Sequence, residues 1–184
     1  EAAEVLEQTN RELRSALEAN RRAQERLEQE MLEREEVQKK LVFLSYHDPL
    51  TGLYNRRFFE EESERIDVPR NLPITLLMAD LNGLKLINDS FGHAQGDAML
   101  VEIARIMREA CRSDDILARM GGDEFMVLLP RTDAAAAEGI AERMRQLAEN
   151  RKVGPLRVSA SFGADTKRHA GIPLQGIFNQ AESR

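Results

Sequence analysis

The chain has 184 residues, a formal net charge of −6 and a single cysteine, Cys111. The length suits one globular domain with an appendage, and the negative charge argues against a nucleic-acid-binding surface. One cysteine excludes an internal disulfide, and no apolar run approaches the ~18 residues of a membrane span. We therefore expect a cytoplasmic protein without a membrane segment. Because the sequence begins at Glu1 within a helical pattern, we expect a fragment of a longer chain.

Residues 1–44 predict a coiled coil. They contain no Gly or Pro, and Glu, Arg, Gln, Leu and Ala dominate. A seven-residue repeat, interrupted by Asn20 and Arg34, carries leucines at Leu6, Leu13, Leu27 and Leu41. Repeats of this length are typical of coiled coils. The alternative is a single solvated helix, in which regularly spaced exposed leucines would contribute nothing.

Two alternative frames are possible for the second apolar position of the repeat. One frame adds Ala16, Ala23, Val37 and Leu44, and the other adds Ala3, Leu17 and Met31. Asn20 within the repeat favours a dimer. We hypothesise that the helix packs in two registers of similar energy, so that an upstream input rotates the domain on its C-terminal side. Cysteines at positions 16 and 17 that crosslink in the same ratio in every input state would contradict this.

From residue 45 onward, glycine, proline and short apolar runs indicate a folded domain. Residues 45–55 predict a break and turn, followed by a short helix over 56–66 and a loop over 69–73. Further helices are predicted over 84–91, 97–112, about 133–150 and from 173 onward. Strands are predicted over 74–79, 116–120, 125–129 and 156–162. This alternation indicates an α/β or α+β fold.

The most informative stretch is Gly121-Gly122-Asp123-Glu124-Phe125. Two glycines between apolar strands indicate a β-hairpin, because glycine accepts the positive φ of tight turns. The absent side chains leave room for a phosphate near the backbone. Two adjacent carboxylates repel each other unless a positive charge lies between them, which suggests metal-assisted nucleotide chemistry. A solvated turn with two incidental acids is the alternative, since short motifs also occur by chance.

A second acidic position, Asp80, ends the apolar run over 74–79. If that strand pairs beside the hairpin, Asp80 and Asp123 come together. Two carboxylates and a backbone carbonyl, such as that of Leu81, are hard oxygen ligands suited to Mg²⁺, with Mn²⁺ as a substitute. Water and substrate phosphates would fill the remaining positions.

Several motifs in one order carry a family resemblance. Residues 80–89 read DLNGLKLIND, Gly92-His93 and Gly96-Asp97 come next, and GGDEF stands at 121–125. Together with DPLTGLYNR at 48–56, these stretches resemble the GGDEF family of diguanylate cyclases from about residue 45 to the end. The resemblance predicts a signalling helix over 1–44 and a catalytic domain over 45–184.

The resemblance implies a palm-like α+β fold, in which helices surround a mostly antiparallel sheet. The family condenses two GTP molecules into cyclic di-GMP and releases two pyrophosphates. Each subunit would hold one GTP, so the coiled coil would bring two subunits together as a homodimer under an upstream sensor domain. Asp80, Asp123 and the carbonyl of Leu81 would hold the metal. Asp123, supported by Glu124, would help deprotonate the attacking 3′-hydroxyl.

The resemblance also implies a nucleotide site, with Asn88, His93, Asp97, Lys85, Gly121 and Gly122 around the substrate. Asn88 and Asp97 would read guanine. A carboxylate accepts from the N1–H and N2 donors that adenine lacks, and Asn88 can donate to O6. Such a site can reject the wrong base by ~10⁴. Taken singly, Asp97 could cap the long helix, Asn88 could be a helix-end residue and His93 a loop histidine.

Arg112 and Asp115 stand just ahead of the strand that leads into Gly121. An Arg-x-x-Asp at this offset resembles the family's inhibitory site for the product, cyclic di-GMP. Arginine can fork onto guanine or phosphate. The alternative is a cationic helix end followed by a polar turn.

The match departs from the family at three places. Asn82 and Leu84 replace residues that are often Asp and Phe, and neither change removes a proposed ligand. The sequence ends at Arg184, before the family's usual helix with Tyr and Lys, so we expect a truncated or unmatched C-terminal end. The rival interpretations are a catalytically inactive module that binds GTP or cyclic di-GMP, and an inert domain on a coiled-coil scaffold.

Overall fold

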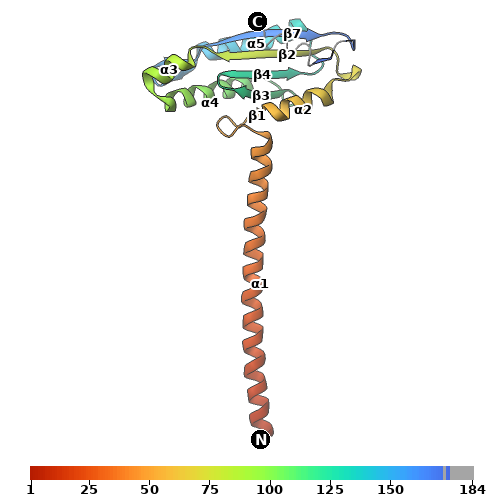
Figure 1. Cartoon of the computed structure of the whole chain (residues 1–184), viewed down its shortest axis with the longest axis vertical. Coiled ribbons are helices and arrows are strands. Elements are labelled where there is room, and N and C mark those ends of the chain that lie inside the picture. The colour runs from red at the N-terminus through yellow and green to blue at the C-terminus, as the bar shows by residue number, and fades with distance from the viewer. Residues whose placement is uncertain (172, 175–184) are drawn as a thin grey trace. The chain divides into compact units, whose positions relative to one another are not determined.

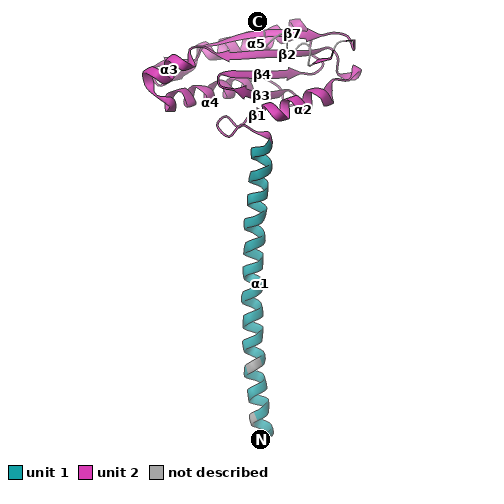
Figure 2. Ribbon diagram, viewed as in Figure 1, with its two compact units in different colours: residues 1–45 teal, residues 46–184 magenta. Residues whose placement is uncertain are grey.

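The computed structural model describes residues 1–171 and 173–174, apart from the side chains of Glu4 and Glu12. The chain divides into two compact units, residues 1–45 and 46–184, which Figure 2 colours separately. The helix expected from residue 173 lies almost entirely outside the described residues.

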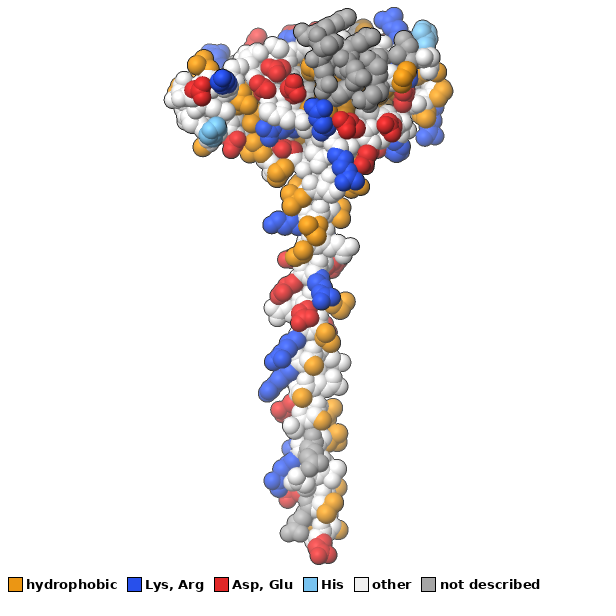
Figure 3. Space-filling model, viewed as in Figure 1, with side chains coloured by type: hydrophobic (Ala, Val, Ile, Leu, Met, Phe, Trp, Pro, Cys, Tyr) orange, Lys and Arg blue, Asp and Glu red, His pale blue; other side chains and the backbone are white. Residues whose placement is uncertain are grey.

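The first unit is a single helix, α1 (Ala2–Tyr46), whose last residue belongs to the second unit. The repeat leucines Leu6, Leu13, Leu27 and Leu41 are 57–64% exposed, and apolar side chains recur between charged ones along the helix (Figure 3). The predicted helix is confirmed and runs two residues further than expected. Exposed apolar positions at this spacing fit a coiled coil, since a helix this long gains most of its stability from packing. Within the described residues, no helix combines the length and hydrophobicity that crossing a bilayer requires.

The second unit is built on a five-stranded sheet in the order β1-β3-β4-β2-β7 (Figure 1). Its strands are β1 (Tyr54–Asn55), β2 (Ile74–Leu81), β3 (Ile116–Gly121), β4 (Glu124–Leu129) and β7 (Ala160–Lys167). The β1–β3 pair is parallel, and the β3–β4, β4–β2 and β2–β7 pairs are antiparallel. The predicted α+β fold with a mostly antiparallel sheet is therefore confirmed.

Helices surround this sheet. They are α2 (Arg56–Ile66), α3 (Leu84–Phe91), α4 (His93–Ala110) and α5 (Ala134–Glu149), with a 3₁₀ turn η1 (Pro69–Asn71) and a small hairpin of β5 (Lys152–Val153) and β6 (Leu156–Arg157). Side-chain caps fix two of the helix starts. Asn55 accepts a hydrogen bond from the backbone N–H of Phe58 at 3.0 Å, and Asp133 accepts one from Ala136 at 2.8 Å. Such caps satisfy backbone donors that the helix itself leaves unpaired.

Alternating side chains of β2 and β4 form two separate cores, because successive residues of a strand face opposite sides of the sheet. One face packs against α4 and α5 through Leu77, Ala79, Leu81, Phe125, Val127 and Leu129. The other face packs against α2 through Ile74, Leu76, Met126 and Leu128. Burial on both faces fixes the register of these strands, and the register determines which groups meet at their ends.

Two boundary errors in the sequence predictions are the largest. Helix α4 begins at His93, four residues before the expected start, because the break falls at Gly92, where φ is 84° and ψ is 160°. The strand predicted over 156–162 is two elements, since β6 ends at Arg157 and β7 begins at Ala160. The first correction matters for function, because it removes Asp97 from the helix end.

Candidate active site

The β3–β4 hairpin places two glycines at its turn. Gly121 has a φ of 150° and Gly122 a φ of 53°, a backbone region that residues with a side chain rarely adopt. The register shifts between Arg119 and Gly121, which marks a β-bulge, and Gly121 then pairs with Glu124. A Cβ at either glycine would meet nothing within 4 Å. Backbone conformation therefore requires glycine here, and the space beside the turn stays open.

Asp80 lies at the same end of the sheet as this turn. In the β2–β4 pairing Asp80 stands opposite Glu124, and the backbone N–H of Leu81 donates to the carbonyl of Asp123 at 3.1 Å. Burial raises the pKa of Asp80, and the charges of Asp123 and Glu124 raise it further. The strand pairing that the sequence suggested thus brings the three acidic residues together.

The chemistry of this acidic end fits a divalent cation. Within the described residues, no three His, Cys, Asp or Glu side chains are grouped so that they alone could hold a metal ion. Asp80 and Asp123 offer carboxylate oxygens, and Leu81 offers a backbone carbonyl. Hard oxygen donors in this small number suit Mg²⁺, which keeps several positions for water and substrate phosphates.

The expected base-reading residues lie on α3 and α4. Chain continuity links them to the acidic end, since β2 ends at Leu81 and α3 begins at Leu84. Lys85, His93 and Asp97 have exposed side chains. Asp97 is the fifth residue of α4, whose N-cap is Gly92, so it does not cap the helix as one interpretation of the sequence supposed.

Asn88, on α3, is unusual among the described residues. Its side-chain oxygen Oδ1 is buried and has no hydrogen-bond partner. Buried polar atoms are paired in nearly all native structures, and an exception calls for an explanation such as an absent ligand. Its backbone carbonyl, in contrast, accepts from the N–H of Gly92 at 2.9 Å.

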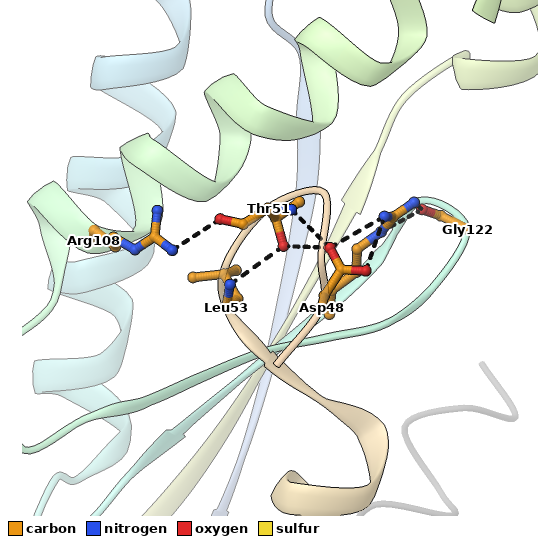
Figure 4. A network of polar contacts seen from close by, with 6 residues as sticks. Asp48, Thr51, Leu53, Arg108 and Gly122 are labelled. Carbon is orange, nitrogen blue, oxygen red and sulfur yellow. Dashed lines mark hydrogen bonds and ion pairs between the residues drawn. The ribbon is translucent and has the colours of Figure 1, made fainter. Parts of the chain in front are cut away.

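A residue that the sequence analysis did not single out, Arg119, holds the glycine turn in place. Its Nε and one terminal nitrogen donate to the carbonyl of Gly122 at 3.1 and 2.7 Å. The other terminal nitrogen donates to both carboxylate oxygens of Asp48 at 3.3 Å. Figure 4 shows the loop of Asp48 and Thr51 beside the turn at Gly122. The guanidinium thereby joins the start of the second unit to the candidate site.

The 48–53 loop is itself tightly bonded. Asp48 accepts from the backbone N–H and the hydroxyl of Thr51 at 2.8 and 2.6 Å, and the carbonyl of Thr51 accepts from Arg108 of α4 at 2.8 Å. Burial favours the neutral form of Asp48, but the bonds from Thr51 and the charge of Arg119 outweigh it and lower the pKa of this carboxyl. The loop is therefore fixed to β3 and to α4 at once.

The Arg112–Asp115 turn precedes β3. Asp115 is buried and accepts from the backbone N–H of Arg112 at 2.8 Å, while the side chain of Arg112 is exposed. Burial raises the pKa of Asp115. Beside it, burial raises the pKa of the Cys111 thiol to about 12, so a thiolate does not form near neutral pH.

Comparison with known proteins identifies the fold family. The family model described as "Diguanylate cyclase, GGDEF domain" matches residues 45–184. The chain belongs to the GGDEF family. The residues at the acidic end are thus the signature stretch of a GGDEF domain, and Asp80 lies on the strand paired with it.

Curated relatives match this chain over part of their own length. The chain is 32% identical over 148 residues to "Probable diguanylate cyclase DgcT" of Escherichia coli, which covers 76% of this chain and 32% of the relative. It is 34% identical over 131 residues to "Bifunctional diguanylate cyclase/cyclic di-GMP phosphodiesterase MucR" of Pseudomonas aeruginosa, which covers 68% of this chain and 19% of the relative. The chain thus spans about a third or less of these proteins.

Solved structures include both parts of the chain. Diguanylate cyclase SiaD of Pseudomonas aeruginosa, crystallised with its activator SiaC, has a TM-score of 0.70 and 34% identity, and the match covers 97% of this chain and 70% of that one. A second structure is the coiled coil and GGDEF domain of DgcB from Caulobacter crescentus, crystallised with c-di-GMP. It has a TM-score of 0.72 and 24% identity, and the match covers 86% of this chain and 89% of that one. The second likeness supports the fold alone.

Proposed function

We propose that this protein is a diguanylate cyclase that condenses two GTP molecules into cyclic di-GMP and two pyrophosphates across a homodimer. The observation that carries the proposal is the meeting of Asp80, Asp123 and Glu124 at an open glycine turn in a GGDEF domain. Carboxylates that repel one another while free are stabilised when a cation occupies the space between them, and the same cation can bind a polyphosphate.

In this proposal Asp80, Asp123 and the carbonyl of Leu81 hold Mg²⁺ or Mn²⁺. The bound ion supplies positive charge to the transferring phosphoryl group. Asp123, with Glu124 in support, accepts the proton of the attacking 3′-hydroxyl. The oxygen then forms a bond to the α-phosphorus of the facing GTP, and the bond from that phosphorus to pyrophosphate breaks. Gly121 and Gly122 leave the backbone accessible to the phosphates, and Lys85 is proposed to offset their charge.

The guanine base is read in this proposal by Asn88 and Asp97, with His93 beside the nucleotide. Two observations support these assignments. Asn88 keeps a buried oxygen without a partner. Asp97 is exposed and has no capping role, so its carboxylate remains available to accept from two donors on one base. Guanine presents such a pair of donors, and adenine does not.

The coiled coil is proposed to hold two such sites near each other. Each domain would carry one GTP, and neither site is complete without the other. The exposed leucines of α1 support pairing with a second copy. Pairing raises the effective concentration of one site at the other. An upstream sensor domain would act by changing how the two domains face each other.

The Arg112–Asp115 turn is proposed as the inhibitory product site. Asp115 is buried and bonded to the backbone, so it holds the turn. Arg112 keeps an exposed guanidinium, which can form paired hydrogen bonds with a guanine edge or a phosphate. In this proposal the side chain of Arg112 contacts cyclic di-GMP, and Asp115 holds the turn that positions Arg112.

The deciding experiment is incubation of the protein in its natural length with GTP and Mg²⁺, followed by chromatography, beside an Asp123→Asn variant. Cyclic di-GMP from the parent and none from the variant would support the proposal. A dimer that binds GTP or cyclic di-GMP and forms no product would support the inactive binding module. An Asp123→Asn variant as active as the parent would overturn the assigned chemistry.

A further inference from the structure

The acidic end of the sheet offers few protein oxygens to a divalent cation. In the part of the chain that the structure describes, no three His, Cys, Asp or Glu side chains are grouped closely enough to hold a metal ion by themselves. Mg²⁺ takes an octahedron of oxygen ligands and keeps several of them as water. A cation makes its bound water a stronger donor, so the hydrogens of that water need acceptors nearby. Side chains beside Asp80 are placed to supply one.

Ser161 is the neighbour of Asp80 on β7, the strand that pairs with β2 at the edge of the described sheet (Figure 1). The β2–β7 register sets Ser161 opposite Asp80, and the β2–β4 register sets Glu124 opposite it on the other side. Directly opposite residues share a face, with Cβ atoms about 4.5–5.5 Å apart. Ser161 is exposed, and a Cβ at Gly163, on the same face, would meet nothing within 4 Å. The hydroxyl of Ser161 is therefore accessible beside Asp80.

The hydrogen of this hydroxyl is committed to Asn82. Oγ of Ser161 donates to Oδ1 of Asn82 at 2.9 Å. The amide is itself held, because its Nδ2 donates to Oγ of Ser159 at 3.0 Å and the backbone N–H of Asn82 donates to the carbonyl of Ser159 at 2.9 Å. A serine hydroxyl has a single hydrogen and two acceptor lone pairs. Ser161 thus has lone pairs, and no hydrogen, left for a ligand.

The amide of Asn82 also affects Asp80. Without that amide, the hydrogen of Ser161 could turn to the carboxylate opposite it. A carboxylate that accepts a hydrogen bond from a neighbouring hydroxyl has one lone pair fewer for a cation. Asn82 therefore keeps the carboxylate of Asp80 available and makes Ser161 an acceptor.

We propose that Ser161 is a further binding residue of the cation site, where its Oγ accepts a hydrogen bond from a water of the cation's hydration shell, and that Asn82 is the positioning residue that takes the hydrogen of Ser161. This inference rests on the proposed function, because it assumes that Asp80 and Asp123 hold a divalent cation. It extends that site from the acidic residues to a neutral pair on the neighbouring strand and turn.

The test measures the affinity of Mn²⁺ for the protein in its natural length, bound to the α,β-methylene analogue of GTP. Free Mn²⁺ is quantified by electron paramagnetic resonance, and the analogue cannot release pyrophosphate, so turnover does not interfere. Ser161→Ala should weaken Mn²⁺ binding about tenfold, the lower end of the range for groups that hold the ligands of a metal. Affinity for the analogue without any divalent cation should change less than about twofold, well below that step.

Two substitutions of Asn82 test which way the hydroxyl points. Asn82→Leu removes the acceptor and releases the hydrogen of Ser161, so Mn²⁺ affinity should fall about tenfold. Asn82→Asp still accepts that hydrogen, so its Mn²⁺ affinity should equal or exceed the parent's. In a Ser161→Ala background the hydrogen is absent, and adding Asn82→Leu should cost less than about a further twofold.

Thr166→Val is the matched control for the strand pairing. The hydroxyls of Thr166 and Thr75 lie 2.8 Å apart, and these residues are opposite each other at the other end of the same β2–β7 pairing. The variant removes a side-chain hydrogen bond between the same two strands, away from Asp80. It should leave Mn²⁺ affinity unchanged.

An Asp80→Asn variant separates the inference from the function beneath it. If Asp80→Asn loses Mn²⁺ while Ser161→Ala and Asn82→Leu retain it, the inference alone fails. If Asp80→Asn binds Mn²⁺ as the parent does, the assigned cation site fails together with the inference. Ser161→Ala that weakens the metal-free analogue equally, or Asn82→Asp that binds Mn²⁺ as weakly as Asn82→Leu, would also overturn the inference. Should Asn82→Leu fail to fold, Ser161→Ala and Asn82→Asp decide the matter between them.

Discussion

Replacing Arg119 by methionine removes a side chain that joins the 48–53 loop to the glycine turn. The ion pair is largely buried, with the Arg119 side chain 14% exposed and that of Asp48 18% exposed. Breaking a buried pair by removing one partner costs about 3–5 kcal/mol. Asp48 keeps two hydrogen bonds from Thr51 and some contact with water. We therefore expect unfolding to become easier by about 2 kcal/mol, within the range for hydrogen bonds to charged groups.

Thermal unfolding at several pH values measures this loss. A change of about 2 kcal/mol should lower the melting temperature by roughly 5–10 °C. The pKa of Asp48 is lowered in the folded state, against the effect of burial, by Thr51 and by Arg119. A lowered carboxyl pKa adds stability above the unfolded value of about 3.9, and this stability is lost as the pH falls through the folded value. The gap between parent and variant should be full at pH 7 and narrow below about pH 4.

A matched control is Arg57→Met, which removes an arginine paired with Glu61 at 2.9 Å on the surface of α2. Those side chains are 66% and 52% exposed, and such pairs contribute about 0.2–1 kcal/mol. Arg119→Met should also lose at least about tenfold in turnover at temperatures where it is folded, since the carbonyl of Gly122 is no longer held. Equal melting temperatures for the two variants, with unchanged turnover, would refute the reasoning.

Three further outcomes are expected. Asp80→Asn should abolish cyclic di-GMP formation. It should also raise the free energy of unfolding by about 0.5–1 kcal/mol at pH 7, because it removes a carboxylate directly opposite Glu124. A melting temperature below the parent's would count against this. Arg112→Ala should raise the concentration of cyclic di-GMP needed for half-maximal inhibition at least about tenfold, because one paired hydrogen-bond contact is lost. Inhibition equal to the parent's would contradict the product site. Leu27→Asp should dissociate the dimer in analytical ultracentrifugation and reduce turnover; an unchanged dimer would exclude α1 as the pairing element.

Local elements could be predicted from the sequence wherever periodicity and end signals agreed. Helix α2 (Arg56–Ile66) and helix α3 (Leu84–Phe91) have the boundaries that were predicted, and both hairpin strands were located within a residue. The start of α4 was missed for a physical reason. Gly96 suggests a break when the sequence is considered alone, whereas the structure uses Gly92 for the break and Gly96 for the space beside Asn88.

Contacts between distant segments were harder to predict, because they depend on strand register and on helix packing. Asp80 could be placed near Asp123, since Asp80 ends one strand with a clear apolar run and Asp123 lies in the turn between two others. Arg119 could not be matched with Asp48, 71 residues away, because the pairing needs β1 to lie parallel to β3. The available signal was an arginine within an otherwise apolar run, two residues before a double glycine.

The residues assigned to function are also those that break local rules of stability. The sheet sets Asp80 opposite Glu124, the turn holds two glycines at positive φ, and Asn88 buries an oxygen without a partner. Each of these features lowers the stability of the domain, whereas elsewhere its helix ends are capped and its core is closely packed. Such departures persist where function requires them. A cation held between the carboxylates would compensate their charge, and the phosphates of a nucleotide would bind the same cation. Each ligand should therefore bind more tightly when the other is present, so the two together should raise the melting temperature by more than the sum of their separate effects.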